Sequence, residues 1–195
     1  MIVGAAATRN TAYNAVMARK VRRLKKADYS IKEFNGFRKD LLSAALSVPS
    51  TLADGESGHV YLLLDDNGLS KFTKIIGLTQ KRVPNPGTTP LILGNDSHAI
   101  IAQKTAKQNS DCDAYYSQEG AYDGLKDQMI NNVPKICLQV LEDEDTGFLL
   151  VTPRQMLEHL QARAEVTDPA QIYTLLTERD EPIDFEGEEV LATFF

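Results

Sequence analysis

The segment 121–176 constrains the fold more than any other part of the chain, because two amphipathic helical patterns lie on either side of an acidic interruption. Large apolar residues recur in both patterns at the spacing of a helix that buries one face. They are Leu125, Met129, Ile130 and Val133 in the first pattern and Met156, Leu157 and Leu160 in the second. Residues 142–147 hold no apolar side chain, so the chain must reach the surface there before 148–151 return to a core. We therefore expect a helical module, a hinge and a second helical module.

The composition is that of an ordinary folded protein, with 43% hydrophobic and 25% charged residues in 195. This length allows one domain or two small ones. The chain has no apolar run of membrane-spanning length and its start does not read as a secretory signal, so we expect an intracellular, cytoplasmic protein. Two cysteines, Cys112 and Cys137, are too few for a disulfide scaffold or a zinc site made of four thiolates. We expect both to be reduced, with Cys137 in the core.

Charge is distributed unevenly along the chain. Residues 1–26 carry seven basic side chains and no acidic one, whereas residues 108–195 carry five basic and nineteen acidic side chains. The chain thus has a basic head and an acidic tail. Such asymmetry permits contact between the N-terminal end and a polyanion, and it equally permits head-to-tail attraction between copies of the protein.

Helical patterns dominate the rest of the chain. Helices are expected over 12–26, 37–46, 70–76, 97–115, 125–133 and 134–141. Residues 29–36 are expected to be extended, and Gly120 is expected to kink or restart its helix. The apolar run Val60 to Leu64 fits either a strand or a buried helical turn, and three prolines predict a long loop over 77–93.

Two sharp helix starts follow in the last third of the chain. Thr152 and Asp168 are each followed by a proline at the first helical position and by a glutamine three residues after the cap. Helices are therefore expected over 153–164 and 169–179, and a last one over 186–195. No alternation of strands and helices is evident, so the predicted fold class is mainly α.

Recognisable chemistry is scarce. His59, His98 and His159 lack a second ligand at metal-binding spacing, so a solvated or hydrogen-bonded structural role is favoured for each. The acidic interruption has part of the spacing of an EF-hand calcium loop. It does not fit that motif, because Arg154 occupies the position of the glutamate that ligates calcium at the end of the loop. No phosphate-binding glycine loop or catalytic constellation is present, so no cofactor is predicted and an enzyme is the least favoured class.

The basic cluster of the N-terminal segment is the one candidate binding site. It consists of Arg19, Lys20, Arg22, Arg23, Lys25 and Lys26, on the basic amphipathic helix expected over 12–26. Basic runs without interleaved aromatic residues usually form solvated faces. This cluster therefore has two alternative interpretations, a solvated face and a nucleic-acid contact.

A series of short motifs resembles the gag-type capsid polyprotein of copia-like LTR retrotransposons, over residues 31 to the end. The motifs are PGTT at 86–89, the helix 99–107, LKDQMINNVP at 125–134, the leucine-bearing helix to Leu141, TGF at 146–148, VTPRQMLEHLQ at 151–161 and VTDPAQI at 166–172. The resemblance implies a non-enzymatic, helical, capsid-like protein of two lobes that self-associates around its own RNA. The chain lacks the C-x₂-C-x₄-H-x₄-C zinc knuckle of such polyproteins and carries no protease, integrase or reverse transcriptase. RNA binding would then fall to the basic cluster.

The expected organisation combines these observations. A basic arm or helix occupies 1–30, an N-terminal helical lobe with the proline-rich loop occupies 31–146, and an incomplete C-terminal lobe occupies 147–195. The apolar end of the last helix, which comprises Val190, Leu191, Phe194 and Phe195, is predicted to mediate self-association. The expected partners are copies of the protein and RNA, without a membrane. The alternative function is a helical nucleic-acid-binding regulator that uses the basic N-terminal segment.

Overall fold

The computed structural model describes residues 2–50, 57–75, 82–87, 90, 92–94 and 96–166. Their secondary structure is helical, and within them no strand is present beyond one isolated bridge between Asp143 and Gly147. The α-helices are α1 (Ile2–Met17), α2 (Ile31–Leu46), α3 (Asp66–Thr73), α4 (His98–Asn132), α5 (Lys135–Leu138) and α6 (Pro153–Val166), with 3₁₀ turns η1 (Val60–Leu62) and η2 (Gln139–Leu141). The predicted class, mainly α, is confirmed.

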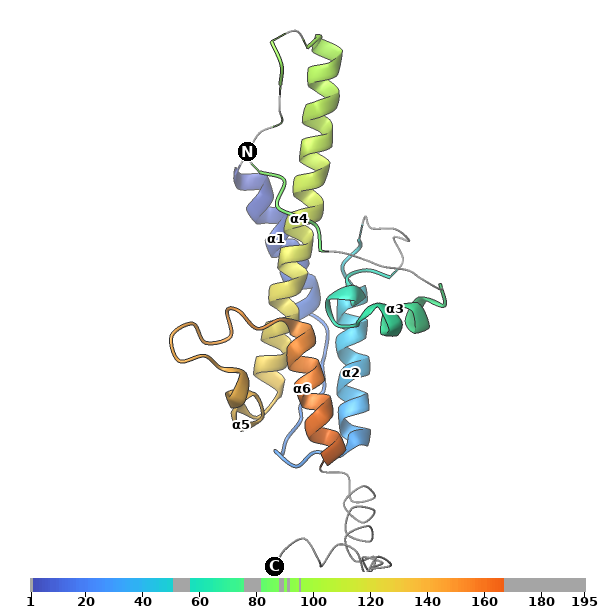
Figure 1. The fold of residues 1–195 in the computed structure, drawn as a ribbon, viewed down its shortest axis with the longest axis vertical. Helices are drawn as coiled ribbons and strands as arrows, with labels where there is room; N and C mark the ends of the chain where they lie inside the picture. Colours follow the sequence, from blue (N-terminus) through green and yellow to red (C-terminus); the bar gives the residue numbers. More distant parts are fainter. Residues whose placement is uncertain are drawn as a thin grey trace, which may run out of the picture.

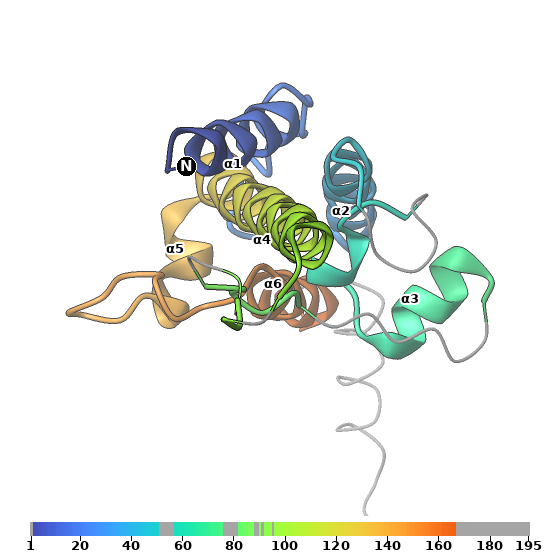
Figure 2. The ribbon, with the colours of Figure 1, turned by 90° about the horizontal axis from the view of Figure 1, so that it is seen from above.

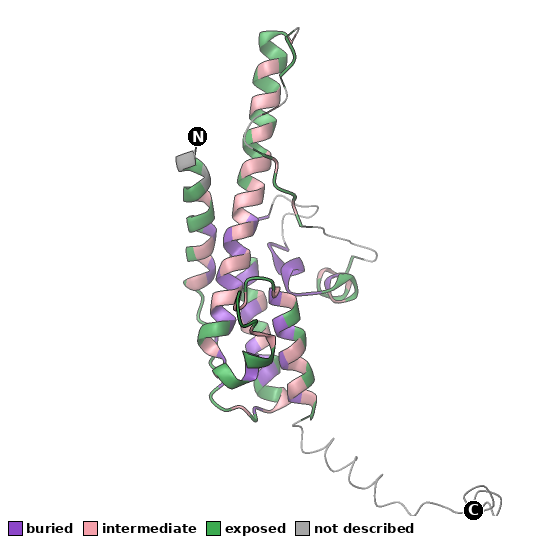
Figure 3. Cartoon of the chain, turned by 60° about the vertical axis from the view of Figure 1, so that its left-hand side comes forward, coloured by how far each residue is buried: buried purple, intermediate pink, exposed green. Residues whose placement is uncertain are grey.

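Helix α4 is the axis of the bundle. Its lower half lies between α1, α2 and α6, whereas its upper half extends beyond them (Figures 1 and 2). Burial follows this arrangement, since the buried positions gather in the lower half of the molecule (Figure 3). Eight of the largest buried side chains come from α1, α2, α4 and α6: Val16, Phe34, Phe37, Leu41, Leu125, Met129, Met156 and Leu160. Each such side chain contributes about 1.5–3 kcal/mol by leaving water.

The contact between α1 and α4 depends on two glycines. A Cβ atom added to Gly120 would lie 2.1 Å from the carbonyl oxygen of Arg9, and one added to Gly124 would lie 2.9 Å from Cβ of Val16. The missing side chains let the two backbones approach closely. The kink or restart expected near Gly120 is wrong, because α4 runs unbroken over 35 residues and its glycines serve packing.

The basic cluster is not helical, so the helix predicted over 12–26 is right only as far as Met17 and wrong over 18–26. Helix α1 begins earlier than predicted and ends at Met17, and residues 18–30 form a connection to α2. The prediction of extended structure over 29–36 is also wrong. Ser30 accepts a hydrogen bond from the backbone N–H of Glu33, and the Glu33 side chain accepts one from the backbone N–H of Ser30. This capping box starts α2 at Ile31.

In the segment 57–75, the structure differs from the prediction in where helix α3 starts. Val60–Leu62 forms the buried helical turn, one of the two alternatives for that run. Helix α3 begins at Asp66, because the Asp65 side chain caps it by accepting from the N–H of Gly68 at 2.7 Å. The start predicted at Ser70 is therefore wrong. Of the predicted proline-rich loop, residues 82–87, 90, 92 and 93 are described and none of them is helical. The backbone N–H of Val83 attaches this segment to Gln118 of α4.

Helix α6 begins as predicted, at Pro153 behind Thr152, and it packs against α2, α4 and α5. Its buried residues belong to the same core as those of α2 and α4. The described part of the predicted C-terminal lobe therefore shares the core of the N-terminal lobe, and 142–147 form an exposed turn between them. Residues 167–195, which include the helices predicted over 169–179 and 186–195, lie outside the described residues, so the extent of that lobe stays a prediction.

Candidate nucleic-acid interface

The connection of residues 18–30, hereafter the basic loop, carries the predicted cluster at the lower end of the bundle. Its apolar residues Val21, Leu24 and Tyr29 are buried, and its cationic residues are exposed. The exposed residues are Arg19, Lys20, Arg22, Arg23, Lys25 and Lys26. The structure thus brings the six predicted residues together on one loop, where apolar anchors separate three pairs of cations.

Polar contacts hold the first half of the basic loop. The side-chain amide of Gln128 on α4 donates to the carbonyl oxygens of Val16, Met17 and Arg19, at 3.2, 3.3 and 3.1 Å. The backbone N–H of Leu24 donates to the carbonyl of Asn132 at 2.8 Å. Because Gln128 is buried, it satisfies carbonyls that the end of α1 leaves without helical partners. The loop therefore follows a defined path.

The second half of the loop is held by α6. The Tyr29 hydroxyl donates to the carbonyl of Leu160 at 2.8 Å, and Nε of Arg163 donates to the carbonyl of Ala27 at 3.1 Å. Burial raises the pKa of Tyr29, which keeps the hydroxyl protonated as a donor. The basic loop is consequently attached to α4 at one end and to α6 at the other.

Arg22 differs from the other cations of the cluster because it has an ion-pair partner. Its guanidinium donates from Nε and Nη2 to the two carboxylate oxygens of Asp40, at 2.7 and 3.1 Å. The hydrogen bond from Arg22 holds the pKa of Asp40 below its usual value. Gly36 leaves room for this pair, since a Cβ there would lie 2.0 Å from Nη1 of Arg22. Arg22 thus fastens the loop to α2, a role that sequence reasoning did not assign to it.

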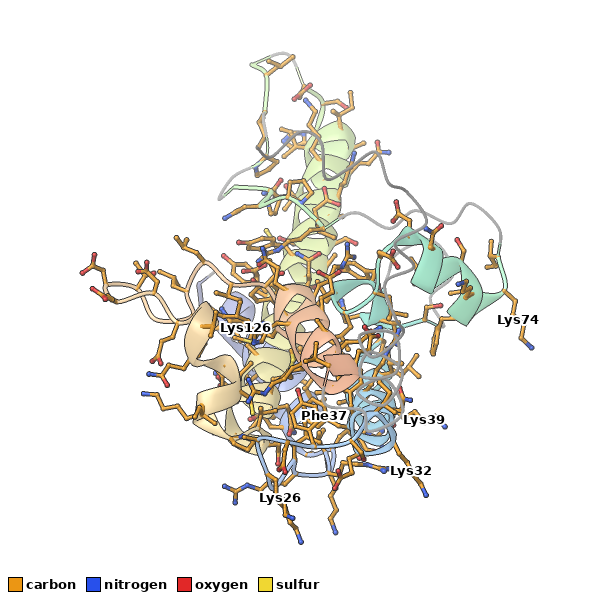
Figure 4. The ribbon with its side chains drawn as sticks, turned by 60° about the horizontal axis from the view of Figure 1, so that its bottom comes forward. Lys26, Lys32, Phe37, Lys39, Lys74 and Lys126 are labelled. Carbon is orange, nitrogen blue, oxygen red and sulfur yellow. The ribbon has the colours of Figure 1, made fainter. Side chains whose placement is uncertain are left out.

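Helix α2 adds cations that sequence reasoning missed. Lys32 and Lys39 are exposed and lie seven residues apart, which places them on one face of α2. Figure 4 shows Lys26, Lys32 and Lys39 pointing outward from the lower part of the bundle. The Arg22–Asp40 pair brings the loop beside this helix. The sequence analysis places Lys32 in an extended segment, so it does not put Lys32 and Lys39 on the same helix face. That common face becomes apparent only when α2 starts at Ile31.

A buried polar cluster at Gln118 ties the middle of the chain to α4. The Tyr61 hydroxyl donates to Oε1 of Gln118 at 2.7 Å, and the backbone N–H of Val83 donates to the same oxygen at 2.7 Å. Nδ1 of His59 lies 3.3 Å from the Tyr61 hydroxyl. Burial lowers the pKa of His59 to about 4, so its imidazole is neutral at pH 7. This cluster connects η1 and residues 82–87 to α4.

The connection between α4 and α6 exposes large apolar side chains. The exposed fractions are 59% for Ile136, 79% for Val140, 71% for Leu149 and 77% for Leu150. We call these four residues the apolar surface group. The segment is attached to α4 through Nζ of Lys126, which donates to the carbonyl of Phe148 at 2.5 Å. The predicted self-association residues Val190, Leu191, Phe194 and Phe195 lie outside the described residues.

The described residues contain neither a metal-ligand cluster nor a membrane-spanning helix. No group of three or more His, Cys, Asp or Glu side chains in this part of the chain is placed to hold a metal ion. Among the described helices, none is both long and apolar enough to span a bilayer. Cys137 is buried, as predicted, and burial raises the pKa of its thiol.

Comparison with models of known protein families, with curated proteins and with solved structures gives no match. The resemblance to gag-type capsid proteins therefore stays a prediction that rests on the motifs.

Proposed function

We propose that this chain is a non-enzymatic, gag-like structural protein that binds nucleic acid through the basic loop and assembles with copies of itself. The observation that carries the proposal is the anchored display of cations on residues 18–30. Buried Leu24 and Gln128 hold the backbone while five cations without the Asp40 ion pair face solvent. Because the loop backbone is already ordered, it loses less conformational entropy when a ligand binds.

The expected ligand contact is the phosphate backbone. Lys and Arg side chains neutralise phosphates irrespective of base sequence. The one aromatic residue of the loop, Tyr29, is buried with its hydroxyl engaged by Leu160, so it does not serve as a stacking platform for bases. Binding is therefore expected to be insensitive to sequence and sensitive to salt.

Self-association is supported by the apolar surface group. Exposed apolar side chains gathered in one segment commonly mark contacts between proteins. The segment is held to α4 by Lys126, so it presents these side chains from a supported backbone. A capsid-like protein requires such surfaces in addition to a nucleic-acid contact.

The alternative function is a monomeric helical regulator that binds nucleic acid through the same loop. The same exposed cations favour it, and the two functions differ in assembly. A regulator forms a complex of defined size on RNA, whereas a structural protein forms particles that grow with RNA length.

Fluorescence anisotropy with a labelled 20-nucleotide single-stranded RNA tests the binding step. The triple variant Arg23→Gln, Lys25→Gln, Lys26→Gln is expected to lose at least about tenfold in affinity at 50 mM salt, and to reduce the slope of log K against log salt by about 2. The matched control neutralises three exposed lysines elsewhere, Lys71, Lys74 and Lys107, and is expected to bind within about twofold of wild type. Equal losses in both variants would show that net charge alone, and not the basic loop, governs binding.

A further inference from the structure

We propose that the acidic segment 178–189 of the same molecule binds the basic loop and competes there with nucleic acid. This inference rests on the proposed function, because it assigns a regulator to the same site. Two features favour this segment as the occupant: its acidic sequence and the position at which α6 ends.

Helix α6 ends beside the basic loop. Arg163, in its last turn, donates to the carbonyl of Ala27, one residue after Lys26. One turn earlier, the carbonyl of Leu160 accepts from Tyr29. The chain that continues after Val166 therefore starts next to the cationic surface, at the lower end of the bundle (Figure 1).

The charges of the two segments are opposite and equal. Residues 19–26 carry six basic side chains and no acidic one, for a net charge of +6. Residues 178–189 carry seven acidic side chains and one basic side chain, Arg179, for a net charge of −6. The acidic residues are Glu178, Asp180, Glu181, Asp184, Glu186, Glu188 and Glu189.

The connecting chain is long enough for contact within one molecule. Eleven residues, 167–177, separate α6 from the acidic segment. A linker of that length spans at most about 40 Å when fully extended. Tethering at this range raises the effective concentration of the acidic segment near the loop to about the millimolar range. Contact in the same molecule is thus favoured over contact between copies in dilute solution.

The expected consequence is a threshold for nucleic-acid binding. Carboxylates of the acidic segment neutralise the cations that would otherwise neutralise phosphates, so RNA must displace them. A long RNA with a dense array of phosphates displaces the segment more readily than a short one does. The chain would then bind short oligonucleotides weakly while its basic loop is covered.

Anisotropy with the full chain and the 20-nucleotide RNA tests the competition. The tail variant Glu186→Gln, Glu188→Gln, Glu189→Gln is expected to bind at least about fivefold more tightly than wild type at 50 mM salt, with the difference shrinking at 200 mM. The control variant Asp66→Asn, Glu144→Gln, Asp145→Asn changes net charge equally at exposed positions of α3 and the acidic turn. Tail and control variants of equal affinity would overturn the inference while leaving the proposed function intact.

A zero-length carbodiimide cross-link tests the contact without RNA. In dilute wild-type protein, mass spectrometry is expected to find links from Lys25 or Lys26 to Glu186, Glu188 or Glu189 within monomers. Links found only in cross-linked dimers would replace the proposed contact with one between copies, and their absence would overturn it. Because this readout contains no RNA, it decides whether the two segments are in contact independently of whether the protein binds the oligonucleotide.

Discussion

At the scale of single residues, Gly120 determines how closely α1 approaches α4. A methyl group at this position would overlap the Arg9 carbonyl, which belongs to backbone and has little freedom to move. We expect Gly120→Ala to lower the free energy of unfolding by about 2–3 kcal/mol, as overpacking does in well-packed cores. Urea denaturation measures the change. Gly4→Ala is the matched control, because nothing lies within 4 Å of a Cβ there.

The control variant Gly4→Ala also has an expected effect on the free energy of unfolding. Alanine favours a helix over glycine by roughly 0.5–1 kcal/mol, so Gly4→Ala is expected to be neutral or slightly stabilising. If Gly120→Ala also stabilises the protein, the two helices are not in the close contact described.

His59 makes stability depend on pH. Burial lowers its folded pKa to about 4, below the unfolded value of about 6.5, so the unfolded chain binds more protons between these values. Its contribution is therefore fully present above pH 6.5 and is lost as the pH falls towards 4, by about 3 kcal/mol in all. The lowered pKa values of Glu33 and Asp40 act only at the acid end of this window, as their carboxylates become protonated.

Urea denaturation of wild type and His59→Gln at pH 7.0, 6.0 and 5.0 isolates this term. The wild-type free energy of unfolding is expected to fall over this range, and the variant is expected to show a flatter profile. Parallel profiles would mean that His59 is solvated and titrates normally.

At the scale of elements, the capping box of α2 controls where the basic loop ends. Ser30→Ala removes the hydroxyl that accepts from Glu33 and is expected to cost about 1 kcal/mol of stability. The control is Ser43→Ala, at an exposed interior position of α2, where alanine is expected to be neutral or better. Thermal unfolding followed by circular dichroism gives both values. Equal melting temperatures for the two variants would contradict the assigned helix start.

Local signals in the sequence predicted some elements well. Thr152, Pro153 and Gln155 predicted the start of α6 because cap, first-turn proline and capping glutamine act within one turn. Ser30 and Glu33 form an equivalent signal for α2, and it was missed because the segment was interpreted as extended. The basic residues after Met17 were assigned to a helix from composition, whereas distant Gln128 and Asn132 set their actual path.

The part of the candidate site that depends on local sequence was predicted, and the part that depends on long-range contacts was not. The six cations are adjacent in sequence, so their common location could be inferred from the sequence alone. The ion pair between Arg22 and Asp40 joins residues 18 positions apart, and the contribution of Lys39 depends on that contact. Tertiary contacts of this kind leave no periodic signature in the chain.

At the scale of the whole molecule, the two surfaces on which the proposed function depends lie on different segments of the chain. The basic loop lies at the lower end of the bundle, and the apolar surface group lies on the connection between α4 and α6. Under the proposed function, nucleic acid and a second copy would therefore bind different segments of one molecule. RNA that gathers several copies raises their local concentration and favours contacts that are weak in free solution.

Sedimentation velocity of the full chain with an RNA of about 1,000 nucleotides, recorded at 260 and 280 nm, tests this account most directly. At 50 mM salt we expect protein and RNA to sediment together as large particles, and at 500 mM salt we expect them to separate, because salt competes for the phosphates. Protein that sediments as a monomer apart from the RNA at 50 mM salt would contradict the account.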